Sequence, residues 1–261
     1  MARASQPRGL FDLAGEVALV TGASSGLGAR FAEVLADNGA RVILAARRTD
    51  RLEALHRKIA DAGGAALPVA MDVTDRQSIA AAFDAAEQSF GTVSVLINNA
   101  GIAMQQKVLE QTPAAWRSML DTNLDGVWFC AQEGARRMVA AGREGSIVNI
   151  ASILGLGVAK TLSAYAVAKA GVIQLTRAMA LELAGKSVRV NAIAPGYVLT
   201  EINEAYFASA AGKAMIGHIP IGRIGAPEDL DGVLLLLASR ASRFMTGSII
   251  VIDGGHGLAI A

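Results

Sequence analysis

Short apolar segments recur along this chain, and each is followed by a longer stretch whose apolar residues have helical spacing. The segments are rich in Val, Ile, Leu and Ala and cover Val17 to Val20, Val42 to Ala45, Leu67 to Ala70, Val93 to Ile97, Ser146 to Ile150, Val188 to Ile193 and Ser248 to Ile252. Strands that are apolar on both faces are typical of a parallel sheet with helices on each side, and the alternation indicates repeated βαβ units. The sequence therefore predicts an α/β fold, a doubly wound sheet of about seven parallel strands with helices on both faces.

Two of the intervening helices can be delimited from the sequence. Asp50 to Ala62 and Asp75 to Phe90 each carry one apolar stripe, and each begins at an acidic residue that suits a helix cap. No repeat, low-complexity segment or Pro/Gly-rich linker divides the chain. Since an α/β chain of 261 residues is ordinarily one unit, residues 1–261 are expected to form a single domain.

One stretch breaks the alternation of strands and helices. Thr200 to Arg223 mixes aromatic and apolar residues with Gly and Ala, and it lies between the sixth strand and a helix that opens at Pro227. Insertions beyond the C-terminal end of a strand are where α/β proteins place ligands. A substrate-binding insertion at about 200–223 is one interpretation, and a surface helix packed on the core is the other.

The apolar character of the chain raises the question of a membrane segment. Hydrophobic residues make up 52% of the sequence and its mean hydropathy is +0.40. The uncharged apolar run Val233 to Ala238 is far shorter than the roughly 20 residues of a spanning helix. Leu10 to Val20 follows two arginines as in a signal peptide, but Asp12 and Glu16 interrupt its apolar core. Neither a membrane span nor secretion is expected.

The excess apolarity fits a buried sheet or contacts between subunits. The apolar helix Leu230 to Ala238 and the terminal segment Gly247 to Ile260 offer more hydrophobic surface than one small domain readily covers, which predicts a homo-oligomer, a tetramer. The alternative is that the helix is buried on both sides. The lone Cys130 fits a small buried hydrophobe and a reducing, cytoplasmic location.

The charges of the chain are nearly balanced. Lys and Arg number 24 against 23 Asp and Glu, a formal net charge of +1. No broad field for nucleic acid or anionic lipid follows from this balance, so no nucleic-acid or membrane partner is expected. A small neutral or apolar substrate is the more natural ligand, and no metal site is expected.

A glycine-rich turn follows the first strand directly. Thr21-Gly22-Ala23-Ser24-Ser25-Gly26-Leu27-Gly28 opens a helix, with the spacing Gly-x-x-x-Gly-x-Gly. Glycines let the backbone approach a pyrophosphate, whose charge then meets the unpaired N–H groups of the helix start. A glycine cluster alone fits a structural turn equally well, but its place inside a βαβ unit favours a dinucleotide cofactor and a Rossmann-type domain.

The end of the second strand bears on which dinucleotide binds. An NAD enzyme usually places a carboxylate there to accept from the ribose hydroxyls, and Ala46 occupies that place here. Arg47 follows and suits a phosphate, with Arg48 as a second contact, so NADP(H) is the expected cofactor and NAD(H) is the lesser alternative. Two solvated arginines at a strand–helix junction would look the same. Ser25 supplies no basic group from the glycine turn.

Four polar residues form a candidate catalytic set. Tyr165 and Lys169 lie one helical turn apart in a helix running through Leu183, so the ammonium can lower the pKa of the phenol. Ser152 ends the fifth strand and either hydrogen-bonds a substrate carbonyl or caps a turn. Asn123 lies in a helical region, either as an irregularity that binds water or as a cap.

These four residues, the Thr21 to Gly28 turn and Asn98-Asn99-Ala100-Gly101 together resemble the short-chain dehydrogenase/reductase family over about Asp12 to Gly255. The resemblance implies that Ser152 orients a carbonyl, Tyr165 exchanges its proton, Lys169 holds the ribose and Asn123 anchors a water. It implies cofactor contacts from Gly22, Ser24, Ser25, Gly26, Leu27, Gly28, Arg47, Arg48, Asp72, Val73, Asn99, Ala100, Gly101, Lys169, Pro195, Gly196, Val198 and Thr200. Substrate contacts are expected from Leu154, Tyr197, Tyr206 and Phe207.

The resulting functional prediction is hydride transfer between NADP(H) and a ketone or secondary alcohol, with Tyr165 as general acid and base. A reductase of 3-oxoacyl thioesters on acyl carrier protein or CoA would share this catalytic set. It would need a basic surface beside the cleft, for which the candidates are Arg136, Arg137, Arg143 and Lys160. A catalytically silent dinucleotide-sensing scaffold is the third hypothesis, although a scaffold has no physical need for all four polar residues.

Overall fold

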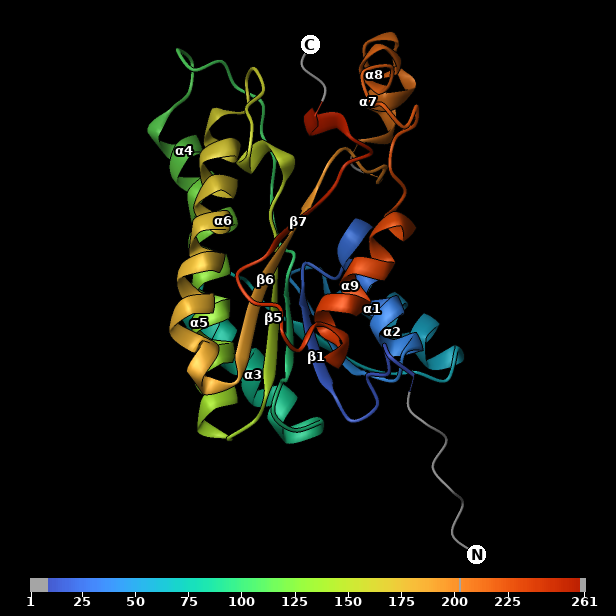
Figure 1. Cartoon of the computed structure of the whole chain (residues 1–261), viewed down its shortest axis with the longest axis vertical. Helices are drawn as coiled ribbons and strands as arrows, with labels where there is room; N and C mark the ends of the chain where they lie inside the picture. The colour runs from blue at the N-terminus through green and yellow to red at the C-terminus, as the bar shows by residue number, and fades with distance from the viewer. Residues whose placement is uncertain (1–8, 202, 259–261) are drawn as a thin grey trace, which may run out of the picture.

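The computed structural model describes residues 9–201 and 203–258, and within them a seven-stranded parallel sheet forms the centre of the molecule (Figure 1). The strands are β1 (Val17–Thr21), β2 (Arg41–Ala46), β3 (Ala65–Ala70), β4 (Val95–Asn98), β5 (Gly145–Ile150), β6 (Val188–Pro195) and β7 (Ile249–Ile252), in the order β3-β2-β1-β4-β5-β6-β7. The predicted doubly wound α/β sheet is confirmed. Every predicted strand is present, with ends that differ by a few residues.

The strand order places the ligand-binding edge of the sheet. From β1 the chain moves outward through β2 to β3, then returns to β4 on the other side of β1, so Leu19 pairs with Ile43 on one side and Leu96 on the other. Crossovers that leave in opposite directions open a crevice at the carboxyl ends of the two strands. All residues of β1, β4 and β5 are buried, the polar Asn98, Ser146 and Asn149 included.

Helices cover both faces of the sheet (Figure 1). One face packs against α1 (Gly26–Asp37), α2 (Thr49–Asp61) and α9 (Asp231–Ala238), through side chains such as Phe31, Leu52 and Leu234. The other face packs against α3 (Arg76–Ser89), α5 (Gly126–Ala140) and α6 (Ser163–Leu183), through side chains such as Phe83, Met138 and Met179. The remaining elements are α4 (Pro113–Leu120), α7 (Glu204–Ala208), α8 (Ala210–Ile216), a π-helical turn at Asp121–Asp125, and 3-10 turns at Ile153–Gly155, Ala184–Lys186, Pro227–Leu230, Arg240–Ser242 and His256–Leu258.

The two predicted acidic helix caps have different outcomes. Asp75 caps α3 as expected, because its carboxylate accepts the N–H of Gln77 at 2.8 Å. Asp50 was expected to cap α2, and this is wrong: the cap position is Arg48, and Asp50 lies inside the first turn. A carboxylate in the first turn still favours the helix through its dipole.

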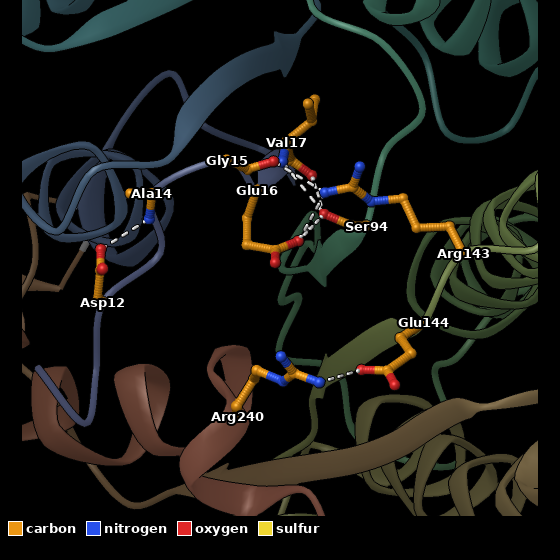
Figure 2. Close-up of polar contacts among 9 residues, drawn as sticks. All are labelled: Asp12, Ala14, Gly15, Glu16, Val17, Ser94, Arg143, Glu144 and Arg240. Carbon is orange, nitrogen blue, oxygen red and sulfur yellow. Dashed lines mark hydrogen bonds and ion pairs between the residues drawn. The ribbon is translucent and has the colours of Figure 1, made fainter. Parts of the chain in front are cut away.

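A polar cluster ties the start of the sheet together at the edge away from the crevice (Figure 2). The hydroxyl of Ser94 donates to the carboxylate of Glu16 and accepts the N–H of Val17 at 3.2 Å. Arg143, in the turn before β5, donates to the carbonyl of Gly15 at 2.8 Å and to Glu16 at 3.1 Å. The side chain of Arg143 is therefore bound at the N-terminal edge of the strands.

The insertion after β6 contains two short helices. It holds α7 and α8, separated by Ser209, whose hydroxyl caps α8 by accepting the N–H of Gly212 at 3.1 Å. In Figure 1 these helices stand above the carboxyl ends of the strands. The insertion ends at an ion pair in which Arg223 contacts Asp229 at 2.6 Å, and this contact helps hold the pKa of Asp229 down at about 2. Ile202, which was part of the predicted insertion, lies outside the described residues.

Two further expectations concern burial. Cys130 is fully buried, and burial raises the pKa of its thiol to about 12, so it packs as a small hydrophobe as predicted. Within the described residues, none of the helices combines the length and the apolar character that a membrane crossing requires.

Candidate active site

A cavity of about 870 Å³ opens at the carboxyl ends of β1, β4, β5 and β6. All the predicted site residues line it except Gly28. Gly28 is buried, and a Cβ at this position would lie 2.3 Å from the carbonyl oxygen of Gly22. This glycine lets α1 pack tightly on the turn, and the expectation that Gly28 contacts the cofactor stays a prediction.

The glycine turn has the geometry of an anion site. Gly22 and Gly26 have φ of +68° and +55°, a region that side chains disfavour. A Cβ at Gly22 would lie 2.9 Å from the Cα of Ala100. Ser25 precedes α1 without a side-chain hydrogen bond to the helix, so the first N–H groups of the helix are free of a side-chain cap. Free N–H groups at the positive end of a helix suit a phosphate.

The crevice between β1 and β4 is held by a compact set of hydrogen bonds. The hydroxyl of Thr21 accepts the N–H groups of Asn99 at 3.0 Å and Ala100 at 2.9 Å. In return, the Asn99 amide donates to the carbonyl of Thr21 at 3.0 Å. These bonds fix the glycine turn against the loop after β4, so the cavity floor is preformed.

Two arginines lie at the far end of the cavity, beyond β2. The Arg47 side chain is 73% exposed and its guanidinium is 3.9 Å from the carboxylate of Asp72. Arg48 reaches back to the glycine turn and donates to the hydroxyls of Ser24 and Ser25, each at 2.9 Å. The turn itself contributes no basic residue, as the sequence indicated, but Arg48 brings a positive charge to it.

Asp72 and Val73 close this end of the cavity. Hydrogen bonds from the backbone and side chain of Thr74, together with the charge of Arg47, lower the pKa of Asp72. Val73 is buried against Gly126, where a Cβ would lie 2.9 Å from a methyl group of the valine. The glycine turn, the two arginines and this wall fit a dinucleotide.

Asn123 occupies the π-helical turn between α4 and α5 and is fully buried. Its amide nitrogen donates to the carbonyl of Ile102 at 2.8 Å, and its oxygen accepts the N–H of Ile102 at 2.9 Å. A Cβ on Gly101 would lie 2.7 Å from the same oxygen. Of the two alternatives left by the sequence, the structure supports the helix irregularity and not the cap.

Lys169 lies beneath the middle of the cavity. It is 4% exposed, and its ammonium donates to the carbonyl of Ile150 at 2.7 Å. Burial lowers the pKa of Lys169 to about 8. The Nζ atom is 5.6 Å from the centre of the Tyr165 ring, as the spacing of one helical turn predicts.

Tyr165 and Ser152 meet at the cavity surface. The hydroxyl of Ser152 accepts the N–H of Leu154 at 3.1 Å, so it does cap a turn, and it also hydrogen-bonds the phenol of Tyr165. Burial raises the pKa of Tyr165, and the bond to Ser152 opposes this rise. The expected lowering by Lys169 is not seen in the protein alone, where desolvation of the phenolate is the largest effect on the pKa of Tyr165 and Tyr197 adds to the rise.

The comparisons with known proteins agree with this geometry. A family model described as enoyl-(acyl carrier protein) reductase matches residues 22–257. A cis-4-hydroxycyclohexanecarboxylate dehydrogenase of Sinomonas cyclohexanicum is 42% identical over 241 residues, which cover 92% of this chain and 96% of that relative. The crystal structure of a short-chain type dehydrogenase/reductase from Mycobacterium marinum matches with a TM-score of 0.90 at 43% identity, covering 95% of this chain and 97% of the other.

This chain belongs to the short-chain dehydrogenase/reductase family. A gluconate 5-dehydrogenase from Burkholderia cenocepacia J2315, solved in complex with NADP and tartrate, also matches with a TM-score of 0.92 at 36% identity, covering 96% of this chain and 98% of the other. This short-chain dehydrogenase/reductase is an NAD(P)-dependent enzyme acting on alcohol or carbonyl groups. The hypothesis of a catalytically silent scaffold loses its support.

One end of the cavity lies beyond Tyr165. Tyr197, Tyr206 and Phe207 line it, with ring centres 5.9 Å apart for Tyr197 and Phe207 and 5.1 Å apart for Tyr206 and Phe207, and their contact with a substrate stays a prediction. Leu154 completes the predicted set. Leu156 and Val158, which follow Leu154 closely in the sequence, are 55% and 88% exposed and do not line it.

Other lining residues were missed by the sequence reasoning. They are Met71, Ile102, Ala103, Gln105, Thr122, Ile150, Ala151 and Asn203. Most are small or apolar residues in loops, and no local pattern marks them. Asn203 alone carried a signal, since an Asn three residues after Thr200 can cap it, and here its oxygen accepts the Thr200 N–H at 2.8 Å.

A buried polar ladder anchors α6, the helix that carries Tyr165 and Lys169. Asn98 on β4 donates to Asn149 on β5 at 2.9 Å, and Asn149 donates to Thr176 on α6 at 2.9 Å. All three side chains are at most 2% exposed. Asn149 directly precedes Ile150, whose carbonyl accepts from Lys169. The ladder therefore fixes the helix and the carbonyl relative to each other.

Lys169→Met is expected to stabilise the cofactor-free protein. Because the folded-state pKa is lowered from 10.5 to about 8, the folded state disfavours the ammonium that the unfolded chain carries. This destabilisation is fully present below pH 8 and fades as pH rises to 10.5, where the unfolded lysine also loses its proton. Removing the buried charge at similar volume should raise the free energy of unfolding at pH 7 by about 2–3 kcal/mol.

Urea unfolding tests this expectation when it is measured at about pH 7 and again at a pH above the folded-state pKa of Lys169. The advantage of the methionine variant should shrink at the higher pH. Lys186→Met is the matched control, since Lys186 is exposed and its replacement should change little at either pH. A Lys169→Met protein that is less stable than wild type at pH 7 would contradict the argument.

Proposed function

We propose that this enzyme transfers a hydride between NADP(H) and a ketone or secondary alcohol. The observation that carries the proposal is the grouping at the cavity centre: the phenol of Tyr165 hydrogen-bonded to Ser152, with the ammonium of Lys169 beneath the ring. The gluconate 5-dehydrogenase structure solved with NADP supports the cofactor. The hydroxycyclohexanecarboxylate dehydrogenase supports one feature of the substrate, a secondary alcohol on a group the size of a six-membered ring.

In this mechanism Ser152 and Tyr165 act on the substrate oxygen. NADP(H), when bound, supplies or accepts the hydride. Ser152 donates a hydrogen bond that orients the carbonyl, and Tyr165 gives its proton to the oxygen as reduction proceeds. Burial, which raises the pKa of Tyr165, keeps this proton on the phenol and suits the direction of reduction.

Lys169 and Asn123 support this chemistry from below. In the described part of the chain the Lys169 ammonium has one hydrogen-bond partner, the carbonyl of Ile150. Two of its three N–H groups therefore remain for the ribose of the cofactor and for favouring the phenolate needed in oxidation. Both polar atoms of the Asn123 side chain bond the backbone of Ile102, so we assign it a positioning role, and the water expected at this residue stays a prediction.

A panel of ketones and secondary alcohols, followed by the absorbance of NADPH, tests the proposed function. Turnover of at least one neutral ketone with NADPH is the expected result. NADPH that binds tightly while no ketone in a broad panel is reduced would count against the proposal. A reducing, cytoplasmic location, which the buried Cys130 favours, stays a prediction.

The reductase of 3-oxoacyl thioesters is the second candidate, and it is favoured by a 3-oxoacyl-[acyl-carrier-protein] reductase of Thermotoga maritima that is 37% identical over 243 residues, 93% of this chain and 98% of that relative. Its predicted basic surface is largely absent from the described residues at the cavity mouth. Arg143 is bound at the opposite edge of the sheet (Figure 2), and Arg137 pairs with Asp84 and Glu87 at 2.8 Å and with Glu133 at 2.7 Å. Arg136 lies beside Arg137 on α5, near the end that leads to β5. Of the four candidate residues, Lys160 remains for a basic surface at the cavity mouth. Acetoacetyl-CoA in the same panel separates the two candidates.

The enzyme is expected to be a homo-oligomer, a tetramer. The alternative, that the apolar helix is simply buried, holds for part of α9, where Leu234 and Leu237 are fully buried in the core. In β7, however, Val251 is 42% exposed, and on either side of this strand in the sequence Phe244 is fully exposed and Leu258 is 85% exposed. Light scattering at micromolar concentration should give about four times the mass of one chain. A monomer mass would rule the prediction out.

A further inference from the structure

The distribution of charge in the cavity separates its two ends. Among the described residues that line it, the charged ones are Arg47, Arg48, Asp72 and Lys169. The first three lie beyond β2 and β3, at the end that suits the phosphorylated cofactor. Lys169 is buried beneath Tyr165 and bonded to the carbonyl of Ile150. No described charged side chain therefore lines the cavity on the substrate side of Tyr165.

The polar groups on the substrate side are neutral or already engaged. Asn203 uses both atoms of its amide, accepting from the N–H of Thr200 and donating to the carbonyl of Val198, each at 2.8 Å. Burial and the neighbouring Tyr206 raise the pKa of Tyr197, so its phenol stays protonated. Lys160 and Lys213 are exposed and do not line the cavity. Phenol hydroxyls and the exposed amide of Gln105 are what a ligand meets here.

Aromatic side chains form the apolar wall of this end. Phe207 is 6% exposed and meets Tyr206 and Tyr197 edge-on. The ring of His256 also contacts the ring of Tyr197, with ring centres 5.4 Å apart. Tyr206 is 46% exposed at the mouth, so it can change without disturbing the core. We call Tyr197, Tyr206 and Phe207 the aromatic wall.

We propose that the substrate is an uncharged ketone or secondary alcohol whose apolar body packs on the aromatic wall, and that the enzyme discriminates against the same body carrying a carboxylate. The inference rests on the proposed function and adds the substrate class to it. A carboxylate enclosed here would lose water without gaining a cation, which is costly for a charged group. A neutral body loses little on the same transfer and gains from burial.

A matched pair of ketones tests the discrimination, methyl 4-oxocyclohexanecarboxylate against 4-oxocyclohexanecarboxylate. The carbonyl and ring are common to both, and the charge is remote from the reacting carbon. With NADPH in excess, kcat/KM for the ester is expected to exceed that for the acid by at least about tenfold. This factor corresponds to the one charge-assisted contact that the carboxylate of the acid cannot make with the described residues at this end of the cavity. Equal values, or a preference for the acid, would overturn the inference.

Two variants at the mouth make the cause explicit. Tyr206→Arg places a guanidinium beside the aromatic wall and should raise the acid's kcat/KM relative to the ester by about tenfold or more. Tyr206→Gln removes the same ring without adding charge and is the matched control, expected to keep the preference of the wild type. A Gln variant that shifts as far as the Arg variant would show that the ring, and not charge, sets the preference.

Binding separates a failure of this inference from a failure of the proposed function. Thermal shift of the NADPH complex is measured with cyclohexanecarboxylate and with its methyl ester. If neither ketone is reduced but methyl cyclohexanecarboxylate, and not cyclohexanecarboxylate, raises the melting temperature, the proposed reaction fails and the substrate class stands. If the acid raises it as much as the ester, or if neither does, the substrate class is overturned.

Discussion

Tyr165→Phe is expected to abolish most turnover while leaving the binding of NADPH nearly intact. The substitution keeps the ring over Lys169 and removes the hydroxyl that hydrogen-bonds Ser152. Only the exchangeable proton at the substrate oxygen is lost, and general acid–base catalysis contributes about 10²–10⁴-fold. The measurement is kcat with the best ketone of the panel, together with NADPH titration by fluorescence.

Tyr197→Phe serves as the comparison, since it removes a neighbouring phenol hydroxyl that the proposed mechanism does not use for proton transfer. It is expected to lose far less activity than Tyr165→Phe. If the Tyr165→Phe enzyme kept more than about half of the wild-type kcat with chemistry rate-limiting, the assigned role of Tyr165 would be wrong. Equal losses in the two variants would point to packing of the aromatic pocket as the cause.

Arg47→Ala is expected to reduce the preference for NADPH over NADH. Ala46 leaves no carboxylate at the end of β2 to repel a 2′-phosphate, and the exposed guanidinium of Arg47 can leave its 3.9 Å contact with Asp72 for a stronger anion. One charge-assisted contact of about 1.5–3 kcal/mol corresponds to roughly a 10- to 150-fold preference. Affinities for both reduced cofactors, titrated at low salt, give the ratio.

Arg48 makes a distinguishable contribution, because its guanidinium already bonds the hydroxyls of Ser24 and Ser25. Arg48→Ala should loosen the glycine turn and weaken both cofactors, whereas Arg47→Ala should weaken NADPH selectively. Arg51→Ala is the matched control, since Arg51 pairs with Glu201 at 3.0 Å and does not line the cavity. Equal affinities of the wild type for the two cofactors, or an unchanged ratio in Arg47→Ala, would exclude the assignment of Arg47.

Local patterns in the sequence were sufficient for much of the fold and for the identity of the polar residues at its centre. Runs such as Val95–Asn98 are apolar on both faces, and only a sheet with helices on each side buries both faces. The glycine spacing from Gly22 requires a turn at the start of α1. Tyr165 and Lys169 share a helix face because four residues make about one turn. Each of these features depends on residues close together in the chain.

The contacts that give these residues their chemistry were decided by the tertiary structure. Arg48 meets Ser24 and Ser25 across the ends of two neighbouring strands, and Asn149 meets Thr176 through the packing of α6 on the sheet. Sequence patterns placed Arg143 among the candidates for the cavity mouth, and the fold binds it at the opposite edge.

The protonation states show the same division most clearly. The spacing of Tyr165 and Lys169 predicts a lowered pKa for the phenol, yet burial raises it and lowers the pKa of the lysine to about 8. Spacing along a helix determines which groups are neighbours. Desolvation depends on everything packed around them, including strands and loops far away in the sequence. Local patterns along the chain are therefore sufficient to predict the fold and which groups can react, whereas the pKa values and hydrogen-bond partners of these groups follow from long-range packing.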